Sequence, residues 1–106
     1  MSHYLLAIMK THDAETFAEY QVGTVRTMSA YKMTPVAATG AINVEEGELD
    51  ANVLVLIRFE GEAEYQRWWT SEEYAKIRPL REKSTDTLLA VTFPGTVALP
   101  PDAFTD

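Results

Sequence analysis

The sequence contains no cysteine and only two histidines among its 106 residues. Without thiols the chain cannot form a disulfide, a thiolate nucleophile or a cysteine-ligated zinc site. His3 and His12 stand at opposite ends of an expected strand, roughly 30 Å apart by strand rise, so they cannot share a metal within one chain. A phosphate-binding loop, a nucleophile elbow and a paired-histidine motif are also absent. We therefore expect no metal site and no organic cofactor.

Basic residues are scarce as well: nine Lys and Arg face sixteen Asp and Glu, for a net charge of −7. Such a surface repels phosphate backbones and anionic lipids, so neither nucleic acid nor membrane is an expected partner. The apolar run at residues 4–9 is too short for a signal-peptide core or a bilayer span, which predicts a cytoplasmic location. The length allows one domain, expected over residues 1–95, with residues 96–106 as an extended C-terminal arm.

The apolar pattern of the first half predicts two strands and one helix. Residues 4–9 form a continuous apolar run, typical of a strand buried on both faces. Asp13 is a suitable N-cap for an amphipathic helix over residues 14–31, whose weak point is Gly23. A strand is expected over residues 36–44, with Gly40 marking either a bulge or a close backbone approach.

The second half begins with an acidic turn at residues 45–52, which favours a solvated turn over a divalent-cation site because its spacing matches no calcium loop. Residues 53–57 form the strongest strand signal, and the polar turn predicts an antiparallel hairpin. Residues 62–85 are expected to be helical in two pieces, with a capping box that starts at Thr70 and a restart at Pro79. A last strand is predicted over residues 87–93.

This order, β-α-β-β-α-β, predicts an α+β, ferredoxin-like fold with a four-stranded antiparallel sheet and both helices on one face. Side chains of a strand alternate between the two faces, so only the helix-covered face needs apolar residues. Yet both alternating sets are apolar in the first strand, where Leu5 and Ala7 alternate with Leu6 and Ile8. The second face must therefore be covered too, and a second copy of the chain, sheet against sheet, predicts a homodimer.

The second helical region has a recognisable aromatic pattern. The stretch Trp68-Trp69-Thr70-Ser71-Glu72-Glu73-Tyr74, followed by Arg78-Pro79-Leu80-Arg81, resembles a motif of the family called domain of unknown function 1330. The resemblance covers nearly the whole chain up to Pro94. It implies a dimeric α+β barrel but no known reaction. Related barrels include cofactor-independent monooxygenases, polyketide cyclases and lactone isomerases, which is an analogy of fold alone.

The chain departs from that family at two places. Lys32 and Met33 stand where the family usually has paired glycines after Tyr31. In the following strand, Thr39 and its neighbours replace an arginine that commonly precedes a glycine pair. If that arginine holds an anionic ligand in the relatives, the ligand of this chain is expected to be neutral or more apolar.

The candidate site residues are polar-tipped aromatics, one histidine and arginines. Buried tyrosine hydroxyls and histidine are suited to proton transfer, and an arginine within an apolar strand needs an anionic partner. We therefore predict a site with these catalytic residues: Tyr20, Tyr74, His3 and Arg58. The predicted substrate-binding residues are Trp68, Trp69, Arg81 and Thr39. As alternatives, each aromatic can be core, each histidine an ordinary strand-end or turn residue, and Arg78 and Arg81 can form surface salt bridges with Glu82 or another acid.

Adjacent residues on a helix point about 100° apart, so Trp68 and Trp69 cannot both face the core. We expect Trp68 to pack inward and Trp69 to line a cleft or the dimer seam. Two functions fit this sequence. One is a cofactor-independent enzyme that isomerises, cyclises, dehydrates or oxygenates a small, largely apolar organic molecule between sheet and helices. The other is a non-catalytic dimer that binds a small ligand or a protein, and a roomy pocket with convergent polar groups distinguishes the first from the second.

Overall fold

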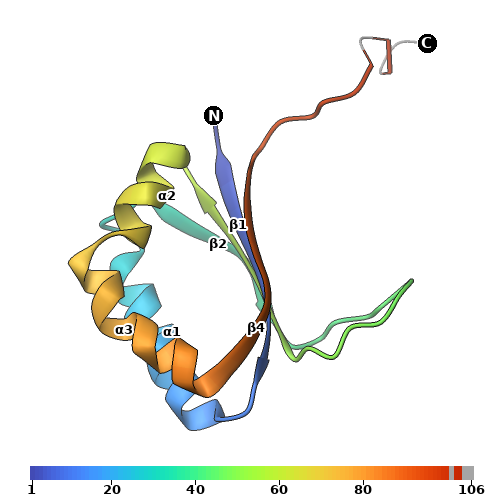
Figure 1. Cartoon of the computed structure of the whole chain (residues 1–106). Helices are drawn as coiled ribbons and strands as arrows, with labels where there is room; N and C mark the ends of the chain where they lie inside the picture. Colours follow the sequence, from blue (N-terminus) through green and yellow to red (C-terminus); the bar gives the residue numbers. More distant parts are fainter. Residues whose placement is uncertain (101, 104–106) are drawn as a thin grey trace.

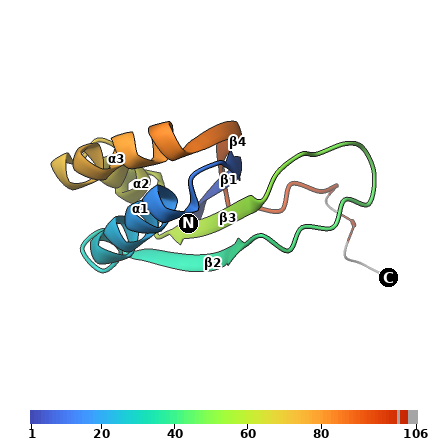
Figure 2. The same ribbon diagram turned by 90° about the horizontal axis from the view of Figure 1, so that it is seen from below.

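A computed structural model describes residues 1–100 and 102–103 of the chain (Figure 1). The elements follow in the order β1 (His3–Thr11), α1 (Ala14–Thr27), β2 (Met33–Thr39), β3 (Val53–Phe59), α2 (Glu62–Trp69), α3 (Glu72–Ser84) and β4 (Thr85–Pro94). The strands form one antiparallel sheet in the order β2-β3-β1-β4, and the three helices lie on one side of it (Figures 1 and 2). This arrangement confirms the predicted ferredoxin-like α+β fold.

Helix α1 starts where the sequence predicts. The carboxylate of Asp13 accepts hydrogen bonds from the hydroxyl of Thr16 at 2.7 Å and from its backbone N–H at 3.1 Å, and these two bonds, the first above all, hold the pKa of Asp13 below its usual value. The predicted extension of the helix to residue 31 is wrong. The helix ends at Thr27, and a turn follows in which Lys32 adopts a φ of 52° and the N–H of Met33 bonds to the carbonyl of Met28. The helix already tightens at its C-cap, where the N–H of Met28 bonds to the carbonyl of Val25, three residues back.

Gly23 weakens α1 as an isolated helix but brings α3 close to it. A β-carbon at this position would lie only 2.7 Å from Cγ2 of Ile77. The two helices can therefore approach closely only because residue 23 has no side chain.

The predicted limits of the β2–β3 hairpin need correction. Strand β2 runs from Met33 to Thr39, because an edge strand tolerates Pro35, and its register shift lies between Pro35 and Ala37. The bulge expected at Gly40 is thus wrong, whereas the alternative of a close approach is correct. A β-carbon there would lie 2.8 Å from the carbonyl oxygen of Asn52. The connection is accordingly a long loop over residues 40–52.

The second helical region divides at the predicted place, into α2 and α3. The N-cap of α3 is Ser71, whose hydroxyl accepts from the N–H of Tyr74 at 3.1 Å, one residue beyond the predicted Thr70. The predicted restart at Pro79 is wrong, because α3 is continuous from Glu72 to Ser84. Packing of α3 against its neighbours outweighs the loss of one backbone hydrogen bond.

The core lies between the sheet and the helices, and the opposite side of the sheet is uncovered. Leu5, Met9, Val53 and Ile57 are buried on the helix side. We call the other side of the sheet the outer face. Its apolar side chains, placed by alternation and strand register, are Leu6, Ile8, Leu54, Leu56, Leu89, Val91 and Phe93. They are half-buried or exposed, so the apolar character of both faces that the sequence predicts is present in the structure.

Two segments leave the sheet on the side of the outer face. Figures 1 and 2 show that the loop over residues 40–52 and the segment after β4 both project away from the helices. Residues 96–100 and 102–103 contain no helix or strand, and residues 101 and 104–106 of the predicted arm lie outside the described residues. Within the part of the chain that the structure describes, no helix is both long and apolar enough to cross a membrane.

Candidate functional site

A cavity of about 280 Å³ lies between the sheet and the helices. Strands β1 and β3 supply its floor, which consists of Leu5, Ala7, Met9, Val55 and Ile57. Helix α1 and its C-cap residue Met28 supply the opposite wall, which also includes Phe17, Tyr20 and Thr24. The wall contributed by α2 and α3 contains Trp68, Trp69, Tyr74 and Arg81. The cavity is therefore apolar over most of its surface, with a few polar groups contributed by the helices.

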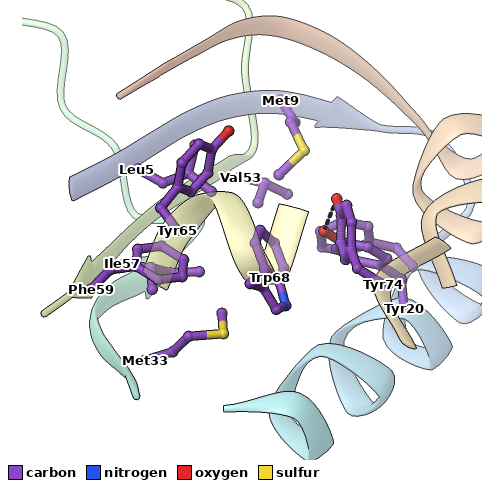
Figure 3. Close-up of a cluster of buried hydrophobic side chains, with 11 residues drawn as sticks. Leu5, Met9, Tyr20, Met33, Val53, Ile57, Phe59, Tyr65, Trp68 and Tyr74 are labelled. Atoms are coloured by element: carbon purple, nitrogen blue, oxygen red, sulfur yellow. Dashed lines mark hydrogen bonds between the residues drawn. The ribbon is translucent and has the colours of Figure 1, made fainter. Parts of the chain in front are cut away.

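Two tyrosine hydroxyls meet at this cavity. The phenolic oxygens of Tyr20, on α1, and Tyr74, in the first turn of α3, lie 2.9 Å apart (Figure 3). Either oxygen can be the donor, and their rings are inclined by 69°. The pair has two phenolic protons, and one hydrogen bond uses only one of them. The second proton is free to bond to a ligand.

Burial sets the protonation state of the pair. It raises the pKa of Tyr20 far above the usual value of a phenol, and the neighbouring Tyr74 raises this pKa further. The positive charge of Arg81 acts in the opposite direction on the same pKa. Tyr20 is therefore neutral at physiological pH and serves as a hydrogen-bond donor.

The two tryptophans occupy different environments, as predicted. Trp68 is 1% exposed, and its indole N–H donates to the hydroxyl of Thr27 at 3.0 Å. That hydroxyl donates in turn to the carbonyl of Thr24 at 2.7 Å, so the indole is tied to the last turn of α1. Trp69 is half-buried, and the guanidinium of Arg78 lies 4.3 Å from its ring centroid. Both rings line the cavity.

The two arginines of α3 differ in their partners. Arg78 forms the expected ion pair with Glu82, at 3.2 Å. The alternative of a surface salt bridge is wrong for Arg81, because no described carboxylate lies within ion-pair distance of its guanidinium. Arg81 instead donates from Nη1 to the hydroxyl of Thr87 at 2.9 Å, while its buried Nε has no acceptor.

Two of the predicted catalytic residues lie away from the cavity. Arg58 is exposed on the outer face, opposite Tyr4 in the strand register. His3 is buried near the start of β1, with its ring centroid 5.9 Å from that of Tyr65, and its Nε2 has no partner. Neither residue is among those that line the cavity.

Thr39 lies beside a second hollow that adjoins the cavity. This hollow shares Phe17, Gln21, Ala38 and Val55 with the cavity, and Thr11, Thr39 and Asn52 add polar groups. The side chain of Asn52 accepts from the N–H of Thr11 at 2.8 Å and donates to its carbonyl at 3.2 Å, which fixes the amide in place. Sequence reasoning missed Gln21 and Asn52, since no motif marks either residue.

The described residues contain no group of three or more histidine, aspartate or glutamate side chains that could hold a metal ion. In the acidic turn, Asp50 is paired with Lys10 at 2.8 Å. The polar side chains that line the cavity are those of Tyr20, Gln21, Thr24, Tyr74 and Arg81, with the indoles of Trp68 and Trp69.

The fold places this chain among ferredoxin-like α+β proteins, and its sequence identifies the family. The chain belongs to the family described as domain of unknown function (DUF1330), whose model matches residues 2–93. This confirms the resemblance drawn from the aromatic motif. No curated protein matches the chain.

Solved structures share its fold at low sequence identity. A protein of unknown function from Rhodopseudomonas palustris superposes with a TM-score of 0.79 and 10% identity, over 92% of this chain and 84% of that one. A dimeric protein of unknown function with a ferredoxin-like fold, from Bacteroides fragilis, gives a TM-score of 0.62 and 10% identity, over 88% and 95%. SnoaB, a cofactor-independent oxygenase from Streptomyces nogalater, gives 0.58 and 14%, over 93% and 97%. At these identities the likeness concerns the fold alone.

Proposed function

We propose that this protein is an enzyme without a bound cofactor that acts on a small, largely apolar organic molecule in the cavity between sheet and helices. The convergence of the Tyr20 and Tyr74 hydroxyls on that cavity is the observation that carries the proposal. If the two hydroxyls had separate internal partners, they would indicate ordinary core. Instead they bond to each other at the edge of an apolar space, with one proton to spare.

The residues of the cavity suggest a division of roles. The Tyr20–Tyr74 pair donates a hydrogen bond to an oxygen of the substrate, since Tyr20 stays neutral. Trp68 and Trp69 provide flat apolar walls for the body of the molecule. Arg81 stabilises negative charge that develops during the reaction. We leave His3 and Arg58 out of the mechanism, because neither lines the cavity.

The reaction proposed is proton-transfer chemistry, such as isomerisation, cyclisation or dehydration, or oxygenation of a substrate that itself activates oxygen. A cofactor-independent oxygenase shares the fold, which supports oxygenation as the first reaction to test. Each of these reactions can develop negative charge on an oxygen of the substrate, which the tyrosine pair and Arg81 would stabilise, and the apolar lining limits access of water.

We also propose that the working form is a homodimer. The outer face has seven apolar side chains without cover from the described part of the chain, and a contiguous apolar surface of this kind marks an interaction site. The loop and the C-terminal segment that flank this face bear further exposed apolar residues: Val44, Leu49, Val97 and Leu99. A second copy docked sheet to sheet would cover both sets, and one structural neighbour is dimeric.

Turnover of a substrate panel tests the proposal. Small phenols, hydroxynaphthalenes, anthrones and enolisable ketones would be incubated with the protein in air, with oxygen uptake and products followed by electrode and mass spectrometry. Tyr74→Phe and Tyr20→Phe should lower the rate about 10²-fold or more if the pair stabilises an oxyanion by hydrogen bonding. Tyr31→Phe is the matched control, because that hydroxyl bonds to Glu73 outside the cavity.

The alternative is a non-catalytic dimer that binds a small ligand. One observation favours this binding protein: the hydroxyls of Tyr20 and Tyr74 bond to each other, so both have a partner without any ligand. If panel members bind saturably and none of them is turned over, the protein is a binding protein and the proposal of an enzyme is wrong.

A further inference from the structure

The charge of Arg81 indicates what kind of molecule the cavity takes. We infer that the ligand bears an oxyanion (a phenolate, an enolate or a carboxylate) on an otherwise apolar body, and that Arg81 and the Tyr20–Tyr74 pair recognise this oxyanion. The inference rests on the proposed function, in which the cavity is the ligand site, and it specifies the chemical class of the ligand.

Arg81 bears a positive charge that no described carboxylate pairs with. Lys10, Lys32, Arg67 and Arg78 each have a carboxylate partner. Arg26, Arg58, Lys76 and Lys83 have no ion pair among the described residues either, but they are exposed, whereas Arg81 is partly buried. Arg81 has only the neutral hydroxyl of Thr87, and its Nε is buried without an acceptor. A partly buried guanidinium without an anion is costly, because desolvation of its charge is not offset. A bound anion would supply the missing partner.

The surroundings of Arg81 strengthen this preference. Among the described residues that line the cavity, Arg81 is the only charged one, and no acidic side chain is present to compete for it. The rest of the lining is apolar or neutral, so the local dielectric is low and attraction to a negative group is stronger than in water. A cationic ligand would be repelled by Arg81 and would find no acidic side chain among the described lining residues. The cavity thus discriminates between ligands by the sign of their charge.

The tyrosine pair adds a hydrogen-bond donor to this charge. One of its two protons is not used internally, and both hydroxyls belong to residues that line the cavity. Arg81 is close enough to Tyr20 for its charge to influence that phenol. An oxyanion between the guanidinium and the phenols would be attracted by the positive charge of Arg81 and would accept a hydrogen bond from a phenol. The two interactions together bind it more strongly than either alone.

This inference changes one expectation drawn from the sequence. The absence of an arginine near Thr39 suggested a neutral ligand. Arg81, on α3, places a positive charge at the cavity that adjoins the hollow beside Thr39. The ligand would therefore be apolar in its body and anionic at one end.

Three probes with the same fused rings separate the role of charge from that of the cavity. These probes are 1-naphthoate, which is anionic, 1-naphthalenemethanol, which is neutral, and 1-naphthylmethylammonium, which is cationic. Isothermal titration at neutral pH with the full chain gives their dissociation constants. We expect naphthoate to bind about tenfold or more tightly than the alcohol, and the ammonium probe to bind most weakly.

Variants assign the preference to Arg81. Arg81→Gln should abolish the advantage of naphthoate while the alcohol binds as before, and Arg81→Lys should restore part of the advantage. Arg67→Gln is the matched control, because Arg67 is paired with Glu64 outside the cavity. If Arg81→Gln does not fold, the relative affinities of the three probes for the unmodified protein still test the charge preference.

The outcomes distinguish this inference from the proposed function. Equal affinity for naphthoate and the alcohol, or tighter binding of the ammonium probe, overturns the inference and leaves the apolar cavity as a ligand site. Absence of binding by all three probes overturns both. An advantage of naphthoate that survives in Arg81→Gln also contradicts the role assigned to Arg81.

Discussion

The hydroxyls of Tyr20 and Tyr74 come within 2.9 Å of each other although the residues are 54 positions apart in the chain. Their hydrogen bond joins α1 to α3 at the wall of the cavity (Figure 3). The close approach of these helices at Gly23 and Ile77 makes this contact possible, and the Ser71 cap sets where α3 begins. The same pair thus contributes to both the stability and the proposed chemistry of the protein.

Removing both hydroxyls of this pair should destabilise the fold by less than the two single removals added together. Tyr74→Phe leaves the hydroxyl of Tyr20 buried without a partner, which costs about 1–3 kcal/mol in the free energy of unfolding. Tyr20→Phe leaves Tyr74 in the same state. The double variant leaves no orphaned hydroxyl, so its loss should be smaller than the sum of the single losses. Urea unfolding of the four proteins gives the coupling, and strictly additive losses would show that the bond is not formed in solution.

The hydrogen bond between Trp68 and Thr27 should contribute to stability in a similar way. Thr27→Val preserves the shape of the side chain but leaves the buried indole N–H without its acceptor, at a cost of about 1–3 kcal/mol. Thr27→Ser retains the hydroxyl and is the matched control, with a smaller expected loss. Equal losses in the two variants, measured by urea unfolding, would assign the effect to the lost packing of the methyl group.

Stability should fall at alkaline pH, in part because of Tyr20. Burial raises the pKa of this tyrosine in the folded protein above the value of about 10 that it has when unfolded. Its contribution is fully present below pH of about 10 and is lost as pH rises toward the folded value, because the unfolded chain ionises first. Urea unfolding between neutral and alkaline pH should therefore show a decline that is shallower in Tyr20→Phe. The same decline in both proteins would contradict the raised pKa.

The apolar outer face should hold two copies together. Light scattering at micromolar concentration should give about twice the chain mass of 11.9 kDa. Leu89→Glu, which places a charge among the exposed residues of that face, should give a monomer. Val22→Glu is the control, since Val22 is 51% exposed on α1, on the other side of the sheet. A stable monomer of the unmodified protein would remove the reason for proposing a dimer.

The regular parts of the fold follow from local patterns. Alternation of apolar residues in β1 and β3, the Asp13 cap and the break after Trp69 are all determined by neighbours along the chain, and these were predicted correctly. The end of α1 and the continuity of α3 through Pro79 were not, because no local sequence signal marks the turn after Thr27 and because tertiary packing of α3 outweighs the effect of Pro79.

The site was only partly predictable from the sequence, because its contacts depend on the tertiary structure. Sequence reasoning named Tyr20, Tyr74, Trp68, Trp69 and Arg81, which the structure places around one cavity. It could not show that the two hydroxyls bond to each other, nor that Arg81 rather than Arg78 lacks an acid. The position of Arg58 on the outer face follows from strand register, and a shift of one residue would have turned it toward the helices.

The most direct test of the central claim, that this cavity binds a small apolar organic molecule, uses the four methionines of the chain as reporters. Met9 and Met28 line the cavity, Met33 is buried in the core outside its lining, and Met1 is 81% exposed. With methyl-labelled methionine, titration of 1-naphthoate or 1-naphthalenemethanol should shift the methyl signals of Met9 and Met28 saturably and leave Met1 unchanged. Unchanged signals for Met9 and Met28 at saturating probe, or shifts at Met1 alone, would contradict the account.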